Sequence, residues 1–226
     1  VAEKVMLLNP FTISVSGGEP LVRKDFKEFT EKLRSKFKGI LVLMTNSINI
    51  DDEMAKYLIQ KYDGFEISLD GYDEETCSAI RGKGVFEKVM NAIRILKKYD
   101  SKICLSMVKT KITEQHINKF NDLCKKLDVA SMIRVFEPIG RGEIHKDKLN
   151  TYDEYECTCN IDWLSTQKTF IKNELFRFAP KIYSCKGANY EFQIDQKGDV
   201  YPCPLFMSED YKLFNLLDNN VTEEYI

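Results

Sequence analysis

Two glycines and a carboxylate form the first segment whose residue types could do chemistry. The segment Gly17-Gly18-Glu19-Pro20 follows a short apolar run at residues 11–15. Glycines let a ligand approach the backbone closely, and free backbone N–H and C=O groups can hold the ammonium or carboxylate of an amino acid. A plain turn between a strand and a helix explains these four residues equally well.

A hydroxyl and a carboxylate end a second apolar run. Ser68 and Asp70 are two positions apart, so both side chains point to the same side of an extended strand. A carboxylate there can accept ribose hydroxyls, although serine and aspartate also close ordinary turns. The loop that begins at Arg81 is basic and contains two glycines. The planar fork of Arg81 could hold a carboxylate, and the alternative is a solvated loop.

Seven cysteines are spread along the chain. Cys185 and Cys203 flank a predicted β-hairpin, where a pair of thiolates suits a soft metal centre. Zinc is a second option, and two unrelated buried thiols are the third. Cys104 and Cys124 lie in apolar periodic surroundings and are predicted to be buried core residues.

Alternating strands and helices must position these segments. Apolar runs predict five strands, at residues 11–15, 40–44, 65–69, 103–108 and 131–136. Helical spacing predicts four helices between them, at residues 24–37, 51–62, 85–99 and 113–127. Strict alternation implies a parallel sheet whose C-terminal edge gathers the loops of the site. A barrel, a partial barrel and an open sheet are all consistent with this alternation.

The pattern changes near residue 143. Residues 152–178 show helical spacing, and residues 190–201 predict a hairpin with a glycine in its turn. We therefore divide the chain into residues 1–142 and residues 143–226. The chain opens on Val1 rather than on methionine, and both ends look cut, so we expect a fragment of a longer protein.

Charge and composition exclude several classes of partner. Lys and Arg number 33 against 35 Asp and Glu, for a net charge of -2. This balance gives no electrostatic reason to expect binding to nucleic acid or to a membrane surface. No apolar run approaches the roughly 20 residues that cross a bilayer, and no signal peptide opens the chain. The predicted location is the cytoplasm.

Taken together, the segments resemble the radical S-adenosylmethionine enzymes. Residues 13–21 resemble the glycine-glycine-glutamate-proline motif of that family. Residues 65–71 and the loop that reaches Arg81 are similar to its fourth-strand segment, and residues 134–142 look like the end of its sixth strand. Residues 185–203 resemble the opening of the SPASM region, which holds auxiliary iron–sulfur clusters. The likeness rests on the order and spacing of four motifs.

The resemblance implies a fold and a set of binding roles. The fold would be a partial parallel (β/α) barrel followed by a helix and a small β-hairpin of the SPASM or twitch type. The methionine amino group of S-adenosylmethionine would meet Gly17, Gly18, Glu19 and Pro20. Its ribose or carboxylate would face Ser68 and Asp70, with Arg81 as a carboxylate partner and Ile139 against the adenine. An auxiliary [4Fe–4S] cluster would be ligated by Cys185 and Cys203.

One family motif is missing from these residues. The Cys-x3-Cys-x2-Cys loop that holds the catalytic [4Fe–4S] cluster is absent, and Cys157-Thr158-Cys159 does not fit it. Later SPASM cysteines beyond Cys203 are absent as well. We expect the cysteine triad upstream of Val1, and we expect this fragment alone to be inactive.

The activity that the resemblance implies is reductive cleavage of S-adenosylmethionine to a 5′-deoxyadenosyl radical. That radical would take a hydrogen atom from a peptide or protein in a post-translational modification, with electrons from a flavodoxin or ferredoxin. Two alternatives stay open, namely a non-catalytic relative that binds peptides and an ordinary metal-independent α/β-barrel enzyme. The residues identify neither the substrate nor a catalytic acid or base.

Overall fold

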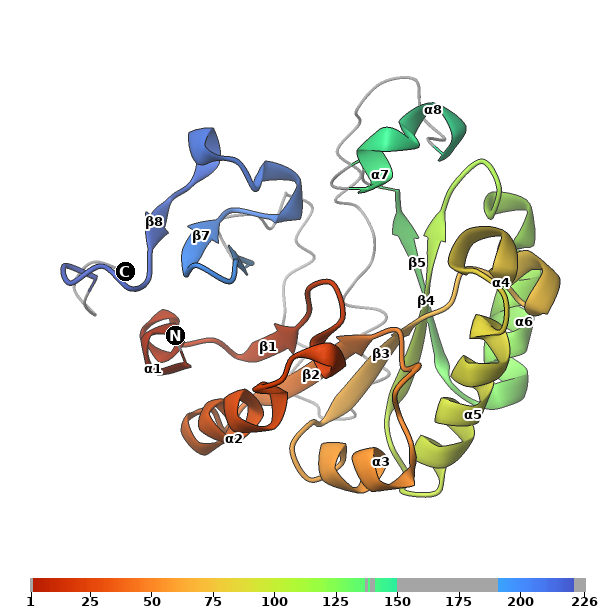
Figure 1. The fold of residues 1–226 in the computed structure, drawn as a ribbon, viewed down its shortest axis with the longest axis horizontal. Helices are drawn as coiled ribbons and strands as arrows, with labels where there is room; N and C mark the ends of the chain where they lie inside the picture. The colour runs from red at the N-terminus through yellow and green to blue at the C-terminus, as the bar shows by residue number, and fades with distance from the viewer. Residues whose placement is uncertain (1, 137, 139–140, 150–190, 222–226) are drawn as a thin grey trace, which may run out of the picture.

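The structure is a computed structural model that describes residues 2–136, 138, 141–149 and 191–221. Its larger part is a parallel sheet with helices on one side, and its smaller part is a separate antiparallel sheet (Figure 1). Both sheets were predicted, the larger as a partial parallel barrel and the smaller as a hairpin. The predicted helix at 152–178 lies outside the described residues.

Five parallel strands form the main sheet in the order of the sequence. They are β1 (Thr12–Val15), β2 (Ile40–Thr45), β3 (Gly64–Ser68), β4 (Ile103–Lys109) and β5 (Ala130–Val135). All five were predicted, and each end lies within one residue of its predicted position. The register pairs Thr45 with Ile67 and Ser68 with Ser106, so the C-terminal strand ends share one edge.

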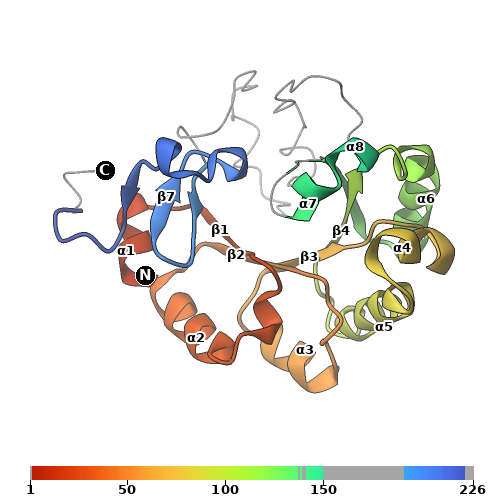
Figure 2. The same ribbon diagram turned by 45° about the horizontal axis from the view of Figure 1, so that its top comes forward.

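The crossing helices cover one face of the sheet. They are α2 (Phe26–Lys36), α3 (Asp52–Leu58), α5 (Val85–Lys97) and α6 (Ile117–Leu127). In Figure 2 these helices form an outer arc around the curved sheet. A short 3-10 turn, η3 (Glu114–His116), precedes α6, and another, η2 (Pro20–Val22), follows β1. The helix predicted at 51–62 ends earlier, at Leu58, and Asp51 caps its start by accepting from the Met54 N–H.

Alternation along the strands separates the two faces of the sheet. Phe65, Ile67 and Leu69 belong to the large buried core beneath the helices. Because successive side chains point to opposite faces, Glu66 and Ser68 lie on the other, concave face. Cys104 and Cys124 are buried, as predicted, and Cys77 is buried as well. Cys77 and Cys124 belong to the core beneath the helices, whereas Cys104 pairs in register with Glu66 on the other face.

A helix that the sequence analysis did not predict follows β3. It is α4 (Glu74–Arg81), and Asp73 begins it with a capping box in which its carboxylate accepts from the Thr76 N–H. Arg81 was predicted in a loop, and this was wrong, because Arg81 is the last residue of α4. Gly71 lets this helix pack closely, since a Cβ atom there would overlap the backbone nitrogen of Cys77.

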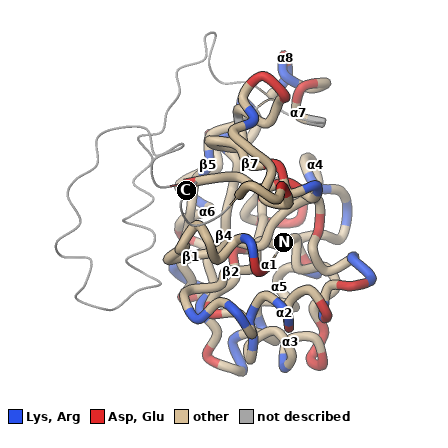
Figure 3. The backbone as a smooth tube through the Cα atoms, turned by 90° about the vertical axis from the view of Figure 1, so that its left-hand side faces the viewer, with Lys and Arg blue, Asp and Glu red and all other residues tan. Residues whose placement is uncertain are grey.

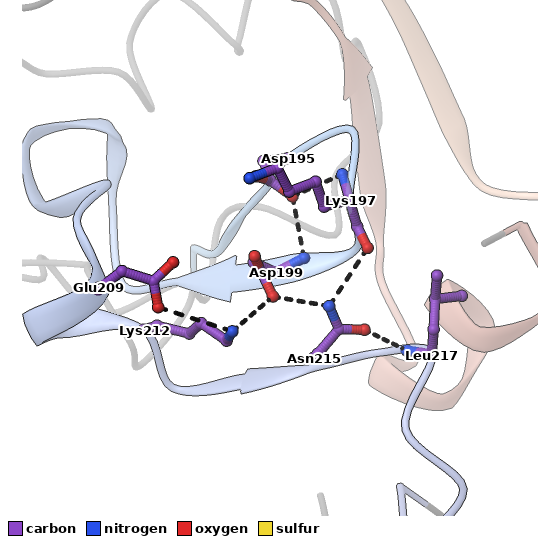
Figure 4. A network of polar contacts seen from close by, with 7 residues as sticks. All are labelled: Asp195, Lys197, Asp199, Glu209, Lys212, Asn215 and Leu217. Atoms are coloured by element: carbon purple, nitrogen blue, oxygen red, sulfur yellow. Dashed lines mark hydrogen bonds and ion pairs between the residues drawn. The ribbon is translucent and has the colours of Figure 1, made fainter.

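The small sheet contains the predicted hairpin and one further strand. Its strands are β6 (Gln193–Ile194), β7 (Asp199–Tyr201) and β8 (Phe214–Asn215). Asp195 shapes the turn by accepting the N–H groups of Lys197 and Asp199 (Figure 4). Four of the short helical segments follow β5 or β7, namely α7 (Arg141–Ile144), α8 (Lys146–Leu149), η5 (Pro204–Phe206) and η6 (Glu209–Tyr211).

The first residues of the chain connect the two parts. Before the first strand, the described chain forms a helical segment that was not predicted, made of α1 (Ala2–Val5) and η1 (Met6–Leu8). Ala2 and Met6 pack against the large core, whereas Leu7 and Leu8 pack against a second core within the small sheet. The predicted boundary at residue 142 stays a prediction.

Charge is mixed over the surface of the described part. Figure 3 shows Lys and Arg interleaved with Asp and Glu along the helices of the main sheet. Several of these charges pair at short range, for example Lys32 with Glu28 at 2.7 Å and Lys61 with Glu31 at 2.8 Å. Among the described residues, no helix has the length and apolar character needed to cross a membrane.

Candidate functional site

The carboxylate of Glu19 ties the glycine segment to the end of β2. Its Oε1 accepts from the Thr45 hydroxyl at 2.7 Å and from the Leu21 N–H at 3.1 Å. Its Oε2 accepts from the Asn46 N–H at 2.7 Å. Both oxygens are therefore engaged by the protein itself. Glu19 positions this segment, and the backbone of the preceding glycines is the part that faces outward.

Gly17 and Gly18 present an open stretch of backbone. Gly17 has a φ of 138°, a conformation that residues with a Cβ atom rarely adopt. A Cβ atom built on either glycine meets nothing within 4 Å, so space lies beside both. Pro20 is buried and begins η2, which fixes the far end of the segment. A ligand can thus approach this backbone closely.

Ser68 and Asp70 lie at the same edge of the sheet, where β3 ends. Ser68 is half-buried, and Asp70 is buried. Asp70 Oδ1 accepts from the Val108 N–H at 2.7 Å, which joins the ends of β3 and β4. Asp70 Oδ2 lies 2.8 Å from Arg81 Nε in an ion pair. The structure therefore places two of the predicted site residues, Asp70 and Arg81, in contact with each other.

The buried thiols show no sign of reactivity. Burial raises the pKa of Cys77 to about 11, with smaller contributions from Arg81, which lowers it, and from two nearby carboxylates. Burial also raises the pKa of Cys104 and of Cys124 to about 12. Since the thiolate is the nucleophile and the metal ligand, these three cysteines act as apolar filling.

The described residues include only one of the two predicted cluster ligands and do not include the predicted adenine contact. Cys203 follows β7 and is half-buried, whereas Cys185 lies outside the described residues. Ile139 lies outside them as well. Within the described ranges, no group of three or more His, Cys, Asp or Glu side chains could hold a metal ion. The assignment of Cys185 and Cys203 to one cluster stays a prediction.

An ion pair that the sequence analysis missed lies on the concave face. Arg134 Nε donates to Glu66 Oε1 at 2.8 Å, and Arg134 Nη2 donates to Glu66 Oε2 at 2.7 Å. Glu66 comes from β3 and Arg134 from β5, with β4 between them. A signal was present, because a charged residue inside an apolar strand needs a partner. The partner itself could not be found without the curvature of the sheet.

Comparison with known proteins defines the class of this chain. The sequence model of the radical SAM superfamily matches residues 3–124, which is more than half of the chain. The chain belongs to the radical SAM superfamily. Membership of this family implies S-adenosylmethionine and a [4Fe–4S] cluster as cofactors.

Individual relatives are distant. The mycofactocin maturase MftC of Mycolicibacterium smegmatis is 28% identical over 233 residues, covering 97% of this chain and 58% of the maturase. A cysteine-type anaerobic sulfatase-maturating enzyme of Clostridium novyi is 28% identical over 250 residues, covering 95% of this chain and 66% of the enzyme. The chain therefore spans about three fifths of the length of the maturase it matches.

Solved structures share the fold. A structure of anSMEcpe with bound AdoMet superimposes with a TM-score of 0.67 at 24% identity, covering 98% of this chain and 69% of that one. Streptococcus suis SuiB gives a TM-score of 0.67 at 15% identity, covering 97% of this chain and 58% of that one. These likenesses confirm the predicted fold class, a partial radical SAM barrel with a small antiparallel sheet.

Proposed function

We propose that this chain forms the S-adenosylmethionine-binding core of a radical enzyme that modifies a peptide or protein. The observation that carries the proposal is the open backbone of Gly17 and Gly18, which Glu19 holds at the same sheet edge as Ser68. Backbone carbonyl groups in such a segment can accept hydrogen bonds from an ammonium group. The Ser68 hydroxyl is suited to the ribose or the carboxylate.

The remaining predicted residues divide into binding and positioning roles. Glu19 and Pro20 would fix the glycine segment, because the Glu19 oxygens already accept three hydrogen bonds and Pro20 is buried. Asp70 would hold Arg81 beside the site through their ion pair, and the terminal nitrogens of Arg81 would meet the methionine carboxylate. Ile139 remains our proposal for the residue against the adenine.

The iron–sulfur clusters would need cysteines beyond the described residues. Bound beside S-adenosylmethionine, a [4Fe–4S] cluster would supply the one electron that cleaves it to methionine and a 5′-deoxyadenosyl radical. We propose that the three cysteines of this cluster lie outside these 226 residues, since the sequence lacks the Cys-x3-Cys-x2-Cys motif. Cys185 and Cys203 would serve an auxiliary cluster, and a flavodoxin or ferredoxin would donate electrons in the cytoplasm.

A peptide or protein is the proposed substrate class. Two relatives are named as a maturase and as a sulfatase-maturating enzyme. One structure that shares the fold, SuiB, is bound to a precursor peptide. On the concave face, Ser14 is exposed and Ser68 is half-buried, so both hydroxyl groups can be reached from that side of the sheet.

The proposal is tested on the full-length protein with its clusters reconstituted anaerobically. With dithionite and S-adenosylmethionine we expect 5′-deoxyadenosine, detected by mass spectrometry. Calorimetry should show that Ser68→Ala lowers the affinity for S-adenosylmethionine roughly tenfold, as expected for one hydrogen bond. Ser35→Ala, on the exposed side of α2, is the matched control. A protein that binds peptides but forms no nucleoside would instead be a non-catalytic relative.

A further inference from the structure

The Glu66–Arg134 ion pair lies deeper in the concave face than the proposed nucleotide site. Arg134 pairs in register with Val108, whose N–H is held by Asp70 at the edge of the sheet. Glu66 is two residues before Ser68 and pairs in register with Cys104. The Arg134 side chain therefore starts near the edge and extends inward, below Ser68, to reach Glu66.

Stability alone does not account for an ion pair at this position. The inward-facing positions of parallel barrels are usually filled by branched apolar side chains. A buried ion pair is often no more stabilising than apolar residues of the same size, because both charges lose their hydration. The exposed fractions of the two side chains are 10% for Glu66 and 37% for Arg134, so desolvation is substantial, above all for the carboxylate.

The pair offers hydrogen-bond donors without offering net charge. Glu66 accepts from Nε and from one Nη2 N–H of Arg134, and a guanidinium has five N–H donors. Among the described residues, neither Nη1 donor of Arg134, the more exposed partner, has a hydrogen-bond acceptor. The carboxylate compensates the positive charge, so an anionic group that approached would also meet the charge of Glu66. An uncharged acceptor, such as a peptide carbonyl or a side-chain amide, suits this arrangement better.

We propose that Arg134, held in place by Glu66, is a specificity-determining residue that donates hydrogen bonds to an uncharged carbonyl oxygen of the peptide substrate. The neutral ion pair selects against an acidic side chain at that point of the peptide. This inference rests on the proposed function, because it takes a peptide to be the molecule that enters the half-barrel.

The test uses the full-length protein, S-adenosylmethionine and two pools of acetylated hexapeptide amides. One pool is built from Gly, Ala, Val, Tyr, Asn and Gln, and the second has Asp and Glu in place of Asn and Gln. Equilibrium dialysis with mass spectrometry gives the ratio of neutral to acidic peptides retained. We expect the unaltered protein to favour the neutral pool by about tenfold, because losing one hydrogen bond to Arg134 lowers the affinity of a peptide by about that factor.

Glu66→Gln is the decisive variant. The glutamine amide oxygen can still accept from Arg134, but the positive charge is no longer compensated. We expect the retained ratio to move by about tenfold or more toward the acidic pool. Glu87→Gln makes the same substitution on the exposed side of α5 and should leave the ratio unchanged. The double variant Glu66→Met with Arg134→Met should keep its melting temperature and lose retention of both pools.

Three results would overturn the inference: equal ratios for the unaltered protein and Glu66→Gln, a preference of the unaltered protein for acidic peptides, or retention of no peptide at all. Formation of 5′-deoxyadenosine is measured in the same preparations. A shifted ratio without the nucleoside would support the specificity role and reject the proposed reaction. Nucleoside formation with an unshifted ratio would reject the specificity role alone.

Discussion

At the scale of single residues, the carboxylates of the site mainly bind other residues of the protein itself. Glu19, Glu66 and Asp70 each accept at least two hydrogen bonds or ion pairs from other described residues. The sequence alone identified Glu19 and Asp70 as candidate site residues. Apart from Leu21, which follows Glu19 in the same segment, the partners of these carboxylates could not be predicted, because they come from parts of the chain that only the fold brings close.

Replacing Glu19 by glutamine tests how Glu19 positions the glycine segment, because it removes the negative charge and keeps the size of the side chain. The glutamine amide keeps one acceptor but turns an NH2 group toward one of the three donors, the hydroxyl of Thr45 or the N–H of Leu21 or Asn46. We expect a loss of about 1–2 kcal/mol in the free energy of unfolding, measured in urea. Affinity for S-adenosylmethionine should fall as well, since the glycine segment would shift.

A control for this change is Glu28→Gln. Glu28 pairs with Lys32 on the exposed side of α2, where each side chain is about two-thirds exposed. An exposed pair of this kind contributes roughly 0–1 kcal/mol, and it lies away from the glycine segment. If Glu28→Gln and Glu19→Gln had the same effect on nucleotide affinity, the positioning role of Glu19 would be wrong.

The buried cysteines should resist alkylation. Burial holds the pKa values of Cys77, Cys104 and Cys124 at about 11 or 12, so these thiols stay protonated at pH 8. Peptide mass spectrometry after iodoacetamide treatment should find all three unlabelled in the folded protein and labelled in urea. Rapid labelling of any one in the folded state would show that its part of the core opens readily.

At the scale of elements, sequence reasoning worked where burial dictates composition. The five strands were found to within one residue because a strand covered on one or both faces reads as an apolar run. The helix α4 was missed although Asp73 and Thr76 form a recognisable cap, since its eight residues bury only Cys77 fully. The strand β8 was missed because two residues, Phe214 and Asn215, carry no periodicity.

Gly71 and Gly18 provide a matched pair of alanine variants. Gly71→Ala would place a methyl group on the backbone of α4, at Cys77, and should cost about 1–3 kcal/mol in the free energy of unfolding. Gly18→Ala meets open space, so stability should change by less than about 0.5 kcal/mol. Affinity for S-adenosylmethionine should nevertheless fall, because the added methyl group occupies the ligand's approach. Unchanged affinity in Gly18→Ala would count against the proposed binding role of this backbone.

The small sheet should loosen in acid. Hydrogen bonding from Lys212 and Asn215, together with the positive charge of Lys212, holds the pKa of Asp199 below its ordinary value (Figure 4). The carboxylate form therefore stabilises the folded sheet above about pH 4, near the unfolded pKa. That contribution is lost as the pH falls through the lower, folded pKa.

Amide hydrogen exchange gives the measurement. The N–H groups of Leu213 and Leu216 bond to Val200 and Gly198 across the small sheet. After correction for intrinsic rates, their protection should fall as the pH drops below about 4, while that of Phe65 in the main sheet changes less. Asp199→Asn removes the titrating group, so its small sheet should show no such step. A step that persists in Asp199→Asn would assign the effect to another carboxylate.

At the scale of the whole molecule, the first eight residues belong to two cores at once. Lys4 Nζ donates to the carbonyl of Val221 at 3.0 Å, and Leu7 and Leu8 pack against the core of the small sheet. Residues at opposite ends of the sequence thus contact each other, because the N-terminal segment packs against both cores. Sequence reasoning placed these two segments in separate units because it has no access to contacts across about 200 residues.

The double variant Leu7→Ala with Leu8→Ala tests whether the small sheet depends on this contact. Both leucines are half-buried, so removing their side chains should cost about 2 kcal/mol in all, enough to speed exchange of the Leu216 N–H roughly 30-fold. The N–H of Leu69, bonded to Ser106 in the main sheet, should keep its protection. Leu123→Ala removes a half-buried leucine on α6 and should spare the small sheet. If Leu7→Ala with Leu8→Ala left Leu216 as protected as before, the small sheet would be stable without the N-terminal segment, and the two cores would be independent.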